Sequence, residues 1–271
     1  MSMITQPTLV RDHSSKLLSG SAKVWFLFAV AGQLIFVFHI LHFYGGATIK
    51  GDLAVWNEIL YHGIITGDTM GNVALGIHLL LAAIITLGGP IQLTPWVQTH
   101  MRRFHRWNGR VYVVTAIVIS LSGLYMIFGR GAVGGPVMGA GNTLNALMIM
   151  VCAVMTMYFA MMGKLDVHRH WALRLYLVVS GVWFFRVGFG LWILIHQGAP
   201  GHTDTFDGPF DIFLAFGHTL IPVALLQLYF WVKEKGGPAS RKAMTLGLVV
   251  LTALMAGGIF MATVIFWLPN S

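Results

Sequence analysis

The chain has 271 residues, of which 56% are hydrophobic and only 10% are charged, and its formal net charge is +8. A soluble domain carries about 25% charged residues, so this composition excludes an ordinary soluble domain and favours an integral membrane protein. The positive charge is spread over loops on one predicted side of the membrane. Anionic lipid headgroups account for it there, and it predicts no nucleic-acid partner.

The polar residues 1–22 predict a cytoplasmic tail, followed by a transmembrane domain over 23–267. Seven apolar runs in that domain reach the roughly 20 residues that an α-helix needs to cross a bilayer. They are far longer than the strands of a membrane barrel. The sequence therefore predicts an all-α integral membrane protein, a bundle of seven transmembrane helices. The predicted spans cover 23–44, 70–94, 107–128, 142–162, 171–196, 210–232 and 243–267.

The basic residues predict the sides of the membrane. With the N-terminus inside, 14 of the 17 Lys and Arg residues fall on the inner side. Such an excess is typical of the cytoplasmic face. We therefore expect a cytoplasmic N-terminus and, after seven crossings, a C-terminus on the outside. The glycine-rich stretch 129–141 is predicted to be a flexible outer turn between two spans.

Two histidines stand at matching depths in different predicted spans. His78 is eight residues into the second span and His218 is eight residues into the sixth. Both would lie ~12 Å below the outer end of their helices. Because imidazoles are common axial ligands of haem iron, the pair predicts a b-type haem held between the two helices. His39, near the outer end of the first span, is a further candidate for binding a cofactor in this layer.

A second layer of histidines stands at the inner ends of the spans. His105 and His168 come just before or at the start of the third and fifth spans, where they would bind a second haem or metal ion, or a quinone. The alternative is that they are cationic anchors for lipid headgroups. Gln92 follows Pro90 at the end of the second span. It is a candidate ligand, although satisfying backbone groups freed by the proline is the favoured role.

Arg186 is predicted to lie within the membrane, ten residues from the outer end of the fifth span and thus ~15 Å deep. A charge inside a bilayer is costly and usually functional. No Asp or Glu occupies a clear mid-span position, so we favour a haem propionate, an anionic substrate, a quinone carbonyl or a water-filled cavity as its partner. The alternatives are snorkelling and bonds to backbone carbonyls or to Asn142 and Asn145.

Four short motifs in the central part of the chain form a set. They are H-L-L-L-A from His78, G-P-I-Q ending at Gln92, H-R-W-N-G-R-V-Y from His105 to Tyr112, and H-R-H-W-A-L-R-L-Y from His168 to Tyr176. Over roughly residues 70–190 the chain resembles the bacterial membrane protein family named "domain of unknown function 2306". The resemblance implies a multi-pass protein of the bacterial inner membrane and implies no activity. The positions that match are His78, Gln92, His105, Arg110, His168, Arg174 and Arg186.

Three functions fit these residues. The leading hypothesis is a membrane redox protein that binds b-type haem, a quinone or both and passes electrons to a membrane partner. As an enzyme it would be a membrane oxidoreductase. The first alternative is a transporter or channel for protons or a small anion, with Arg186 and the histidines along its pathway. The second is an accessory subunit of a larger membrane complex, in which Gly181, Gly188 and Gly190 permit close helix contacts.

Overall fold

The computed structural model describes residues 13–60 and 62–268; it is 86% helical, and no strand occurs among these residues. The long helices are α1 (His13–His39), α3 (Thr69–Leu93), α5 (Arg102–Arg130), α6 (Gly135–Met161), α9 (Pro209–Lys235) and α10 (Pro238–Ala262). The shorter ones are η1 (Ile40–Gly45), α2 (Gly46–Lys50), η2 (Leu53–Glu58), α4 (Pro95–His100), α7 (Leu165–Val179), α8 (Gly181–His196) and η3 (Thr263–Trp267).

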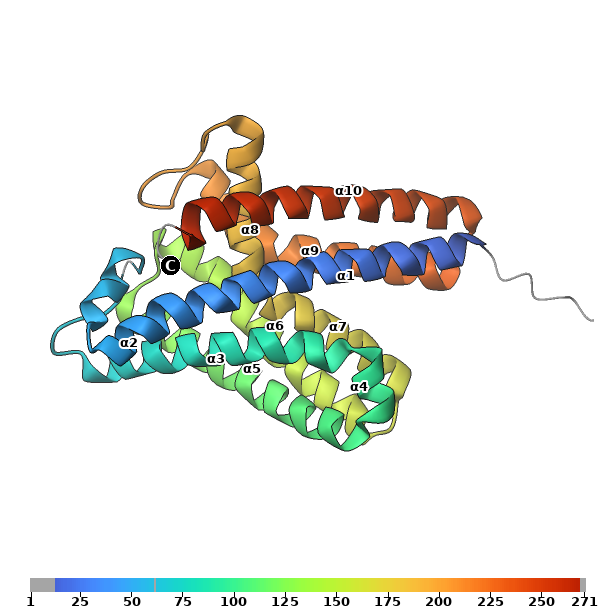
Figure 1. Cartoon of the computed structure of the whole chain (residues 1–271), viewed down its shortest axis with the longest axis horizontal. Coiled ribbons are helices and arrows are strands. Elements are labelled where there is room, and N and C mark those ends of the chain that lie inside the picture. Colours follow the sequence, from blue (N-terminus) through green and yellow to red (C-terminus); the bar gives the residue numbers. More distant parts are fainter. Residues whose placement is uncertain (1–12, 61, 269–271) are drawn as a thin grey trace, which may run out of the picture.

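The predicted all-α membrane fold is confirmed. Six of the described helical segments are long and apolar enough to cross a membrane, and the bent pair of α7 and α8 makes a seventh if it is one span. The start of α1 and the end of α10 lie at opposite ends of the bundle (Figure 1), as an odd number of crossings requires. Which end faces the cytoplasm stays a prediction from the basic residues.

The glycine-rich stretch 129–141 differs from its prediction, because most of it is helical. Helix α5 continues to Arg130, and α6 already begins at Gly135. Pro136 occupies the first turn of α6, where its missing N–H would have had no helical partner. Gly134 supports this start with a left-handed φ of 76°, which glycine adopts without strain. The turn between the two helices is therefore short.

The predicted span 171–196 is broken in the middle. Helix α7 ends at Val179, and α8 begins at Gly181 with its axis bent by 56°. As a result α8 runs across the direction of α10 (Figure 1). A break of this kind leaves backbone carbonyls without their helical donors, and inside a bilayer such groups need partners from the protein.

Asn145 of α6 supplies one of these partners. Its side-chain amide donates to the Val178 carbonyl at 2.9 Å and to the Thr219 hydroxyl of α9 at 2.8 Å. Asn145 is itself buried. A single side chain, through its two amide N–H groups, therefore joins the break to α6 and α9. The Arg186 guanidinium donates instead to the Val182 carbonyl of its own helix.

Glycines allow α8 to approach its neighbours closely. A Cβ on Gly190 would lie 2.8 Å from the backbone N of Ala262 and from the carbonyl of Gly258, both on α10. A Cβ on Gly188 would lie 3.0 Å from the Leu214 side chain of α9. These glycines, predicted to permit contacts with another subunit, pack within the chain itself.

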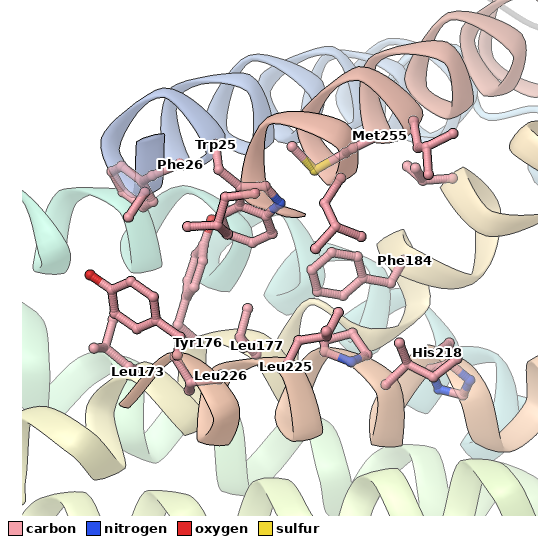
Figure 2. A pocket seen from close by; sticks show the side chains of 18 of the residues that line it. Trp25, Phe26, Leu173, Tyr176, Leu177, Phe184, His218, Leu225, Leu226 and Met255 are labelled. Carbon is pink, nitrogen blue, oxygen red and sulfur yellow. The ribbon is translucent and has the colours of Figure 1, made fainter. Parts of the chain in front are cut away.

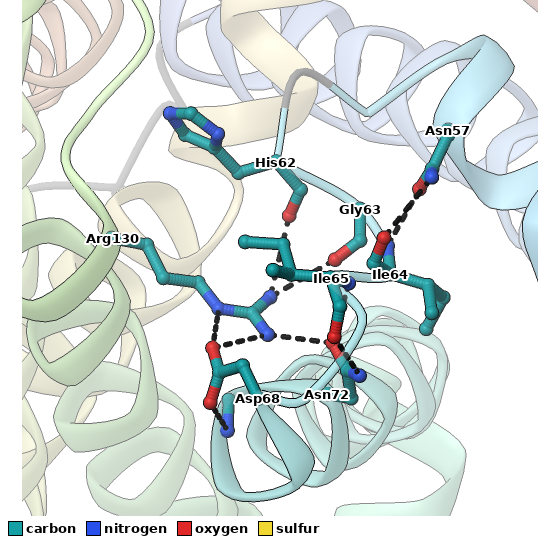
Figure 3. A network of polar contacts seen from close by, with 9 residues as sticks. Asn57, His62, Gly63, Ile64, Ile65, Asp68, Asn72 and Arg130 are labelled. Carbon is teal, nitrogen blue, oxygen red and sulfur yellow. Dashed lines mark hydrogen bonds and ion pairs between the residues drawn. The ribbon is translucent and has the colours of Figure 1, made fainter.

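One arginine ties the loop between η2 and α3 to the helices (Figure 3). The Arg130 guanidinium donates to the Asp68 carboxylate at 2.8 Å, to the Asn72 side chain at 2.6 Å and to the Gly63 carbonyl at 3.0 Å. Asp68 also accepts from the Gly71 backbone N–H at 2.9 Å and so caps α3. The end of α5 is thereby tied to the loop and to the start of α3.

Acid is expected to loosen this loop. The Gly71 N–H and then the Arg130 guanidinium hold the pKa of Asp68 below its ordinary value of 3.8. A carboxylate with a lowered folded-state pKa stabilises the fold above its ordinary value, and that contribution disappears as the pH falls through the folded-state value. We expect hydrogen exchange of loop 53–67, corrected for its intrinsic pH dependence, to accelerate below pH 3.8.

Asp68→Asn should give the same acceleration at neutral pH. Asp52→Asn, a substitution of the same kind directly before this loop, should leave exchange unchanged because Asp52 is exposed. Unchanged protection in Asp68→Asn would show that Arg130 does not hold the loop through this carboxylate.

Candidate functional site

A cavity of about 680 Å³ lies between α1, α7, α8, α9 and α10. Its walls are aromatic and aliphatic along most of their length (Figure 2). Both halves of the broken span contribute, because α7 and α8 each line one part of it. Among the side chains on the walls are Trp25, Phe26, Leu177, Phe184, Leu225, Leu226 and Met255.

One end of the cavity is charged. Arg169 and His170 of α7 meet Lys233 and Glu234 of α9 there. His170 pairs with Glu234 at 3.1 Å and stacks on the Phe230 ring at a centroid distance of 4.1 Å. Arg169 and Lys233 lie close enough to interact electrostatically. The predicted topology places this end at the inner membrane surface.

His218 stands on the wall far from the charged end, beside the helix break. Its ring is 4% exposed, and its Nδ1 lies 2.9 Å from the Leu214 carbonyl. A carbonyl only accepts, so Nδ1 carries the proton, and in the neutral ring Nε2 keeps its lone pair. The ring is also close to Gly181, where an added Cβ would come within 3.0 Å of it. His218 therefore offers an oriented acceptor or ligand nitrogen.

His78, the predicted haem partner of His218, contacts a different part of the bundle. Its Nδ1 lies 2.9 Å from the Ser122 hydroxyl of α5, which in turn donates to the Ile119 carbonyl. Ser122 therefore accepts from His78, and Nε2 of His78 also keeps its lone pair. The neighbours of His78 are on α5, whereas those of His218 are on α8 and α9. One haem bound between these two histidines stays a prediction.

Gln92, His105 and His168 lie together where α3 ends and α5 begins, away from His78. The Gln92 amide donates to the His105 carbonyl at 3.1 Å and lies 3.4 Å from His105 Nε2. Asn108 donates to Gln92 at 2.9 Å and fixes the orientation of the amide. His168 donates from Nδ1 to the Thr156 carbonyl at 2.9 Å and interacts electrostatically with His105. The structure thus brings Gln92, His105 and His168 together.

The cluster of Gln92, His105 and His168 offers two imidazole side chains, those of His105 and His168. Nδ1 of His105 is buried and has no hydrogen-bond partner among the described residues. His168, held through Nδ1 by a backbone carbonyl, has the geometry typical of a metal-ligating histidine. Over residues 13–60 and 62–268, no group of three or more His, Cys, Asp or Glu side chains could hold a metal ion. A metal at this position would need further ligands from a cofactor, as the porphyrin ring of haem supplies them to its iron.

The remaining predicted residues have different surroundings. Arg110 is exposed and lies over the Trp107 ring at 5.1 Å. Arg174 donates twice to the Gln227 side chain of α9, at 2.9 and 2.7 Å, and so links α7 to α9. Arg186 and His39 lie together near the outer half of α1, apart from the residues that line the cavity.

The sequence predictions omitted a buried polar network beside the cavity. The Tyr176 hydroxyl donates to the Gln33 carbonyl oxygen at 3.0 Å, and the Gln33 amide donates to Ser180 at 2.9 Å. The network joins α1 to α7 at the helix break, and Tyr176 also lines the cavity. The sequence signal was Gln33 itself, an uncharged polar residue within an otherwise apolar run.

The fold and the cavity define a multi-span α-helical membrane protein with a cavity whose walls are mostly apolar. Residues 75–205 match the sequence profile of the family described as "Predicted membrane protein (DUF2306)". The resemblance inferred from the motifs is thereby confirmed over that stretch, which runs from α3 to beyond α8 and excludes His39 and His218. No curated protein and no solved structure matches the chain.

Proposed function

We propose that the protein is a membrane redox protein that binds an isoprenoid quinone in the cavity between α1, α7, α8, α9 and α10. The observation that carries this proposal is an apolar cavity of about 680 Å³ with His218 on its wall beside the helix break. This volume is typical of sites for small molecules, which combine apolar walls with a few polar groups. A quinone has the matching chemistry, a ring with two oxygens and a long apolar tail.

His218 would act on the quinol form. A quinol hydroxyl donates a hydrogen bond, and Nε2 of His218 is the acceptor that its bond to Leu214 leaves available. Oxidation of the quinol to the quinone releases two electrons and two protons. One proton would pass to water by way of Nε2, the other directly. The electrons would pass singly to a b-type haem, for which His105 and His168 are the proposed ligands, and from there to a membrane partner.

Bound quinone is the direct test. Protein purified into nanodiscs is extracted with organic solvent, and quinone is measured by mass spectrometry. We expect about one quinone per chain. Leu225→Trp fills the cavity wall and should lower the quinone content about tenfold. Leu228→Trp is the matched control, because Leu228 is on the same helix but is 48% exposed on its surface.

The same samples give a reduced-minus-oxidised absorption spectrum, in which a Soret band is expected for bound haem. Wild-type protein without quinone, or full quinone content in Leu225→Trp, would contradict the proposed binding site. Protein with quinone but without haem or iron would retain the site and reject electron transfer through haem.

A further inference from the structure

A second polar site lies outside the cavity, where α8 faces the outer half of α1. Its central residue is Arg186, whose guanidinium lies over the Phe36 ring at 5.3 Å. Within the described residues the guanidinium forms one hydrogen bond, to the Val182 carbonyl at 3.3 Å. Among the described residues no Asp or Glu pairs with it. A guanidinium has several N–H donors, so most of its hydrogen-bonding capacity is unused by the chain.

A second buried donor is found next to the same aromatic ring. Trp267 packs against Phe36 with ring centroids 5.5 Å apart, and only 2% of its surface is exposed. Its indole N–H has no acceptor in the part of the chain that the structure describes. Burying an N–H without an acceptor costs free energy, which makes this orphan donor a pointer to a missing acceptor.

Two further polar side chains complete the cluster. Tyr44 and His39 both interact electrostatically with Arg186. Both are buried, with 5% and 4% of their surfaces exposed. His39 is held by a bond from Nδ1 to the Trp267 carbonyl at 3.2 Å. The cluster therefore combines one permanent positive charge with neutral polar groups, and no carboxylate from residues 13–60 or 62–268 balances the charge.

The backbone around the cluster is unusual. Tyr44 belongs to the π-helical turn η1, and Trp267 belongs to the π-helical turn η3. The bond from His39, the last residue of α1 before η1, to Trp267 joins the end of α1 to η3. π-Helical turns insert an extra residue, change the direction of side chains and are frequent at functional sites. Here Tyr44 interacts electrostatically with Arg186, and Trp267 packs on the same Phe36 ring that Arg186 lies over.

We propose that Arg186, Trp267 and Tyr44 form a binding site for a small anion in the outer half of the membrane. The site has a positive charge and N–H and O–H donors but no carboxylate among the described residues. Its ligand must therefore carry a negative charge and accept hydrogen bonds. A carboxylate and an inorganic anion such as chloride or nitrate share this chemistry. The proposal does not depend on a quinone in the cavity, because Arg186 is absent from the lining of that cavity.

Anion binding is tested on the whole chain in nanodiscs of neutral phosphatidylcholine, kept in a Tris–HEPES buffer without a small anion. Chloride is added, and binding is followed by broadening of the ³⁵Cl resonance, with nitrate and acetate as competitors. We expect saturable binding that either competitor reverses. The stronger competitor identifies an inorganic anion or a carboxylate as the preferred ligand chemistry.

Arg186→Gln should weaken binding about tenfold or more, because a charge-assisted hydrogen bond contributes about 1.5–3 kcal/mol. Trp267→Phe and Tyr44→Phe each remove one donor and should weaken binding several-fold. Arg110→Gln, which removes the same charge from an exposed position, should bind like the wild type.

The proposal is overturned if none of the three anions binds saturably to the wild type, or if Arg186→Gln binds with unchanged affinity. Should Arg186→Gln fail to fold, the other two substitutions decide. Unchanged affinity in both Trp267→Phe and Tyr44→Phe would reject the site, and weaker binding in either would support it.

Discussion

Replacing Gly258 by valine is expected to abolish folded protein. A Cβ at this position of α10 would collide with the Val187 carbonyl of α8 and lie 2.8 Å from the Val187 Cγ1. The obstacle is backbone, which cannot rotate away as a flexible side chain can. Overpacking typically costs 1–3 kcal/mol when side chains can adjust, and we expect a larger loss here. Helix α8 would lose its close contact with α10, which small residues make possible in membrane bundles.

Fluorescence-detected size-exclusion chromatography measures this effect as the fraction of monodisperse protein. Gly247→Val provides the control on the same helix, because an added Cβ there meets nothing within 4 Å. We expect Gly247→Val to elute like the wild type and Gly258→Val to aggregate or disappear. A normal elution profile for Gly258→Val would mean that α8 does not cross α10 at this point.

The second large effect is expected for Asn145→Leu. Leucine has the same branched outline and the same number of non-hydrogen side-chain atoms as asparagine but removes the donor to the Val178 carbonyl and to Thr219. The carbonyl would then be buried without a partner at the helix break. Leaving a buried polar group unpaired costs about 1–3 kcal/mol. We therefore expect a loss of stability of this size in thermal or denaturant unfolding, followed in detergent micelles.

Asn142→Leu separates this effect from a general change of polarity. Asn142 is one turn earlier on α6 and forms no side-chain hydrogen bond within residues 13–60 and 62–268. Its substitution should change stability little. Thr219→Val closes a double-mutant cycle with Asn145→Leu, and losses that are less than additive would show that the two side chains act together. Equal stability of the Asn145 and Asn142 variants would argue against a tether at the break.

The membrane fold was predictable because length and hydropathy suffice to identify apolar helices. The break in the fifth predicted span was not, because residues 171–196 read as one apolar run. The Val178 carbonyl at the break is satisfied by Asn145, which belongs to another helix and is 33 residues away in the sequence. The helical ends of stretch 129–141 were missed for a local reason, since its glycines concealed the start of α6 at Gly135.

The candidate sites were predictable only in part. Depth in the membrane singled out His218 and Arg186, but it could not reveal which neighbours surround them. His78 has the same predicted depth as His218 and faces Ser122 instead. The cavity was beyond sequence reasoning because its walls come from six helices distributed over the whole chain, with α3 contributing only Leu93. Gln92 and His105 are near in sequence, and their contact was therefore the easiest to anticipate.

The 56° bend between α7 and α8 also changes how the pair fits the thickness of a bilayer. Residues 165–196 in one straight helix would be about 46 Å long, well beyond a hydrocarbon core of about 30 Å. With the bend, the pair advances only about 36 Å along the axis of α7. The break thus relieves hydrophobic mismatch, and a straightened variant would have to tilt, thicken the bilayer around it, or draw one polar end into the lipid.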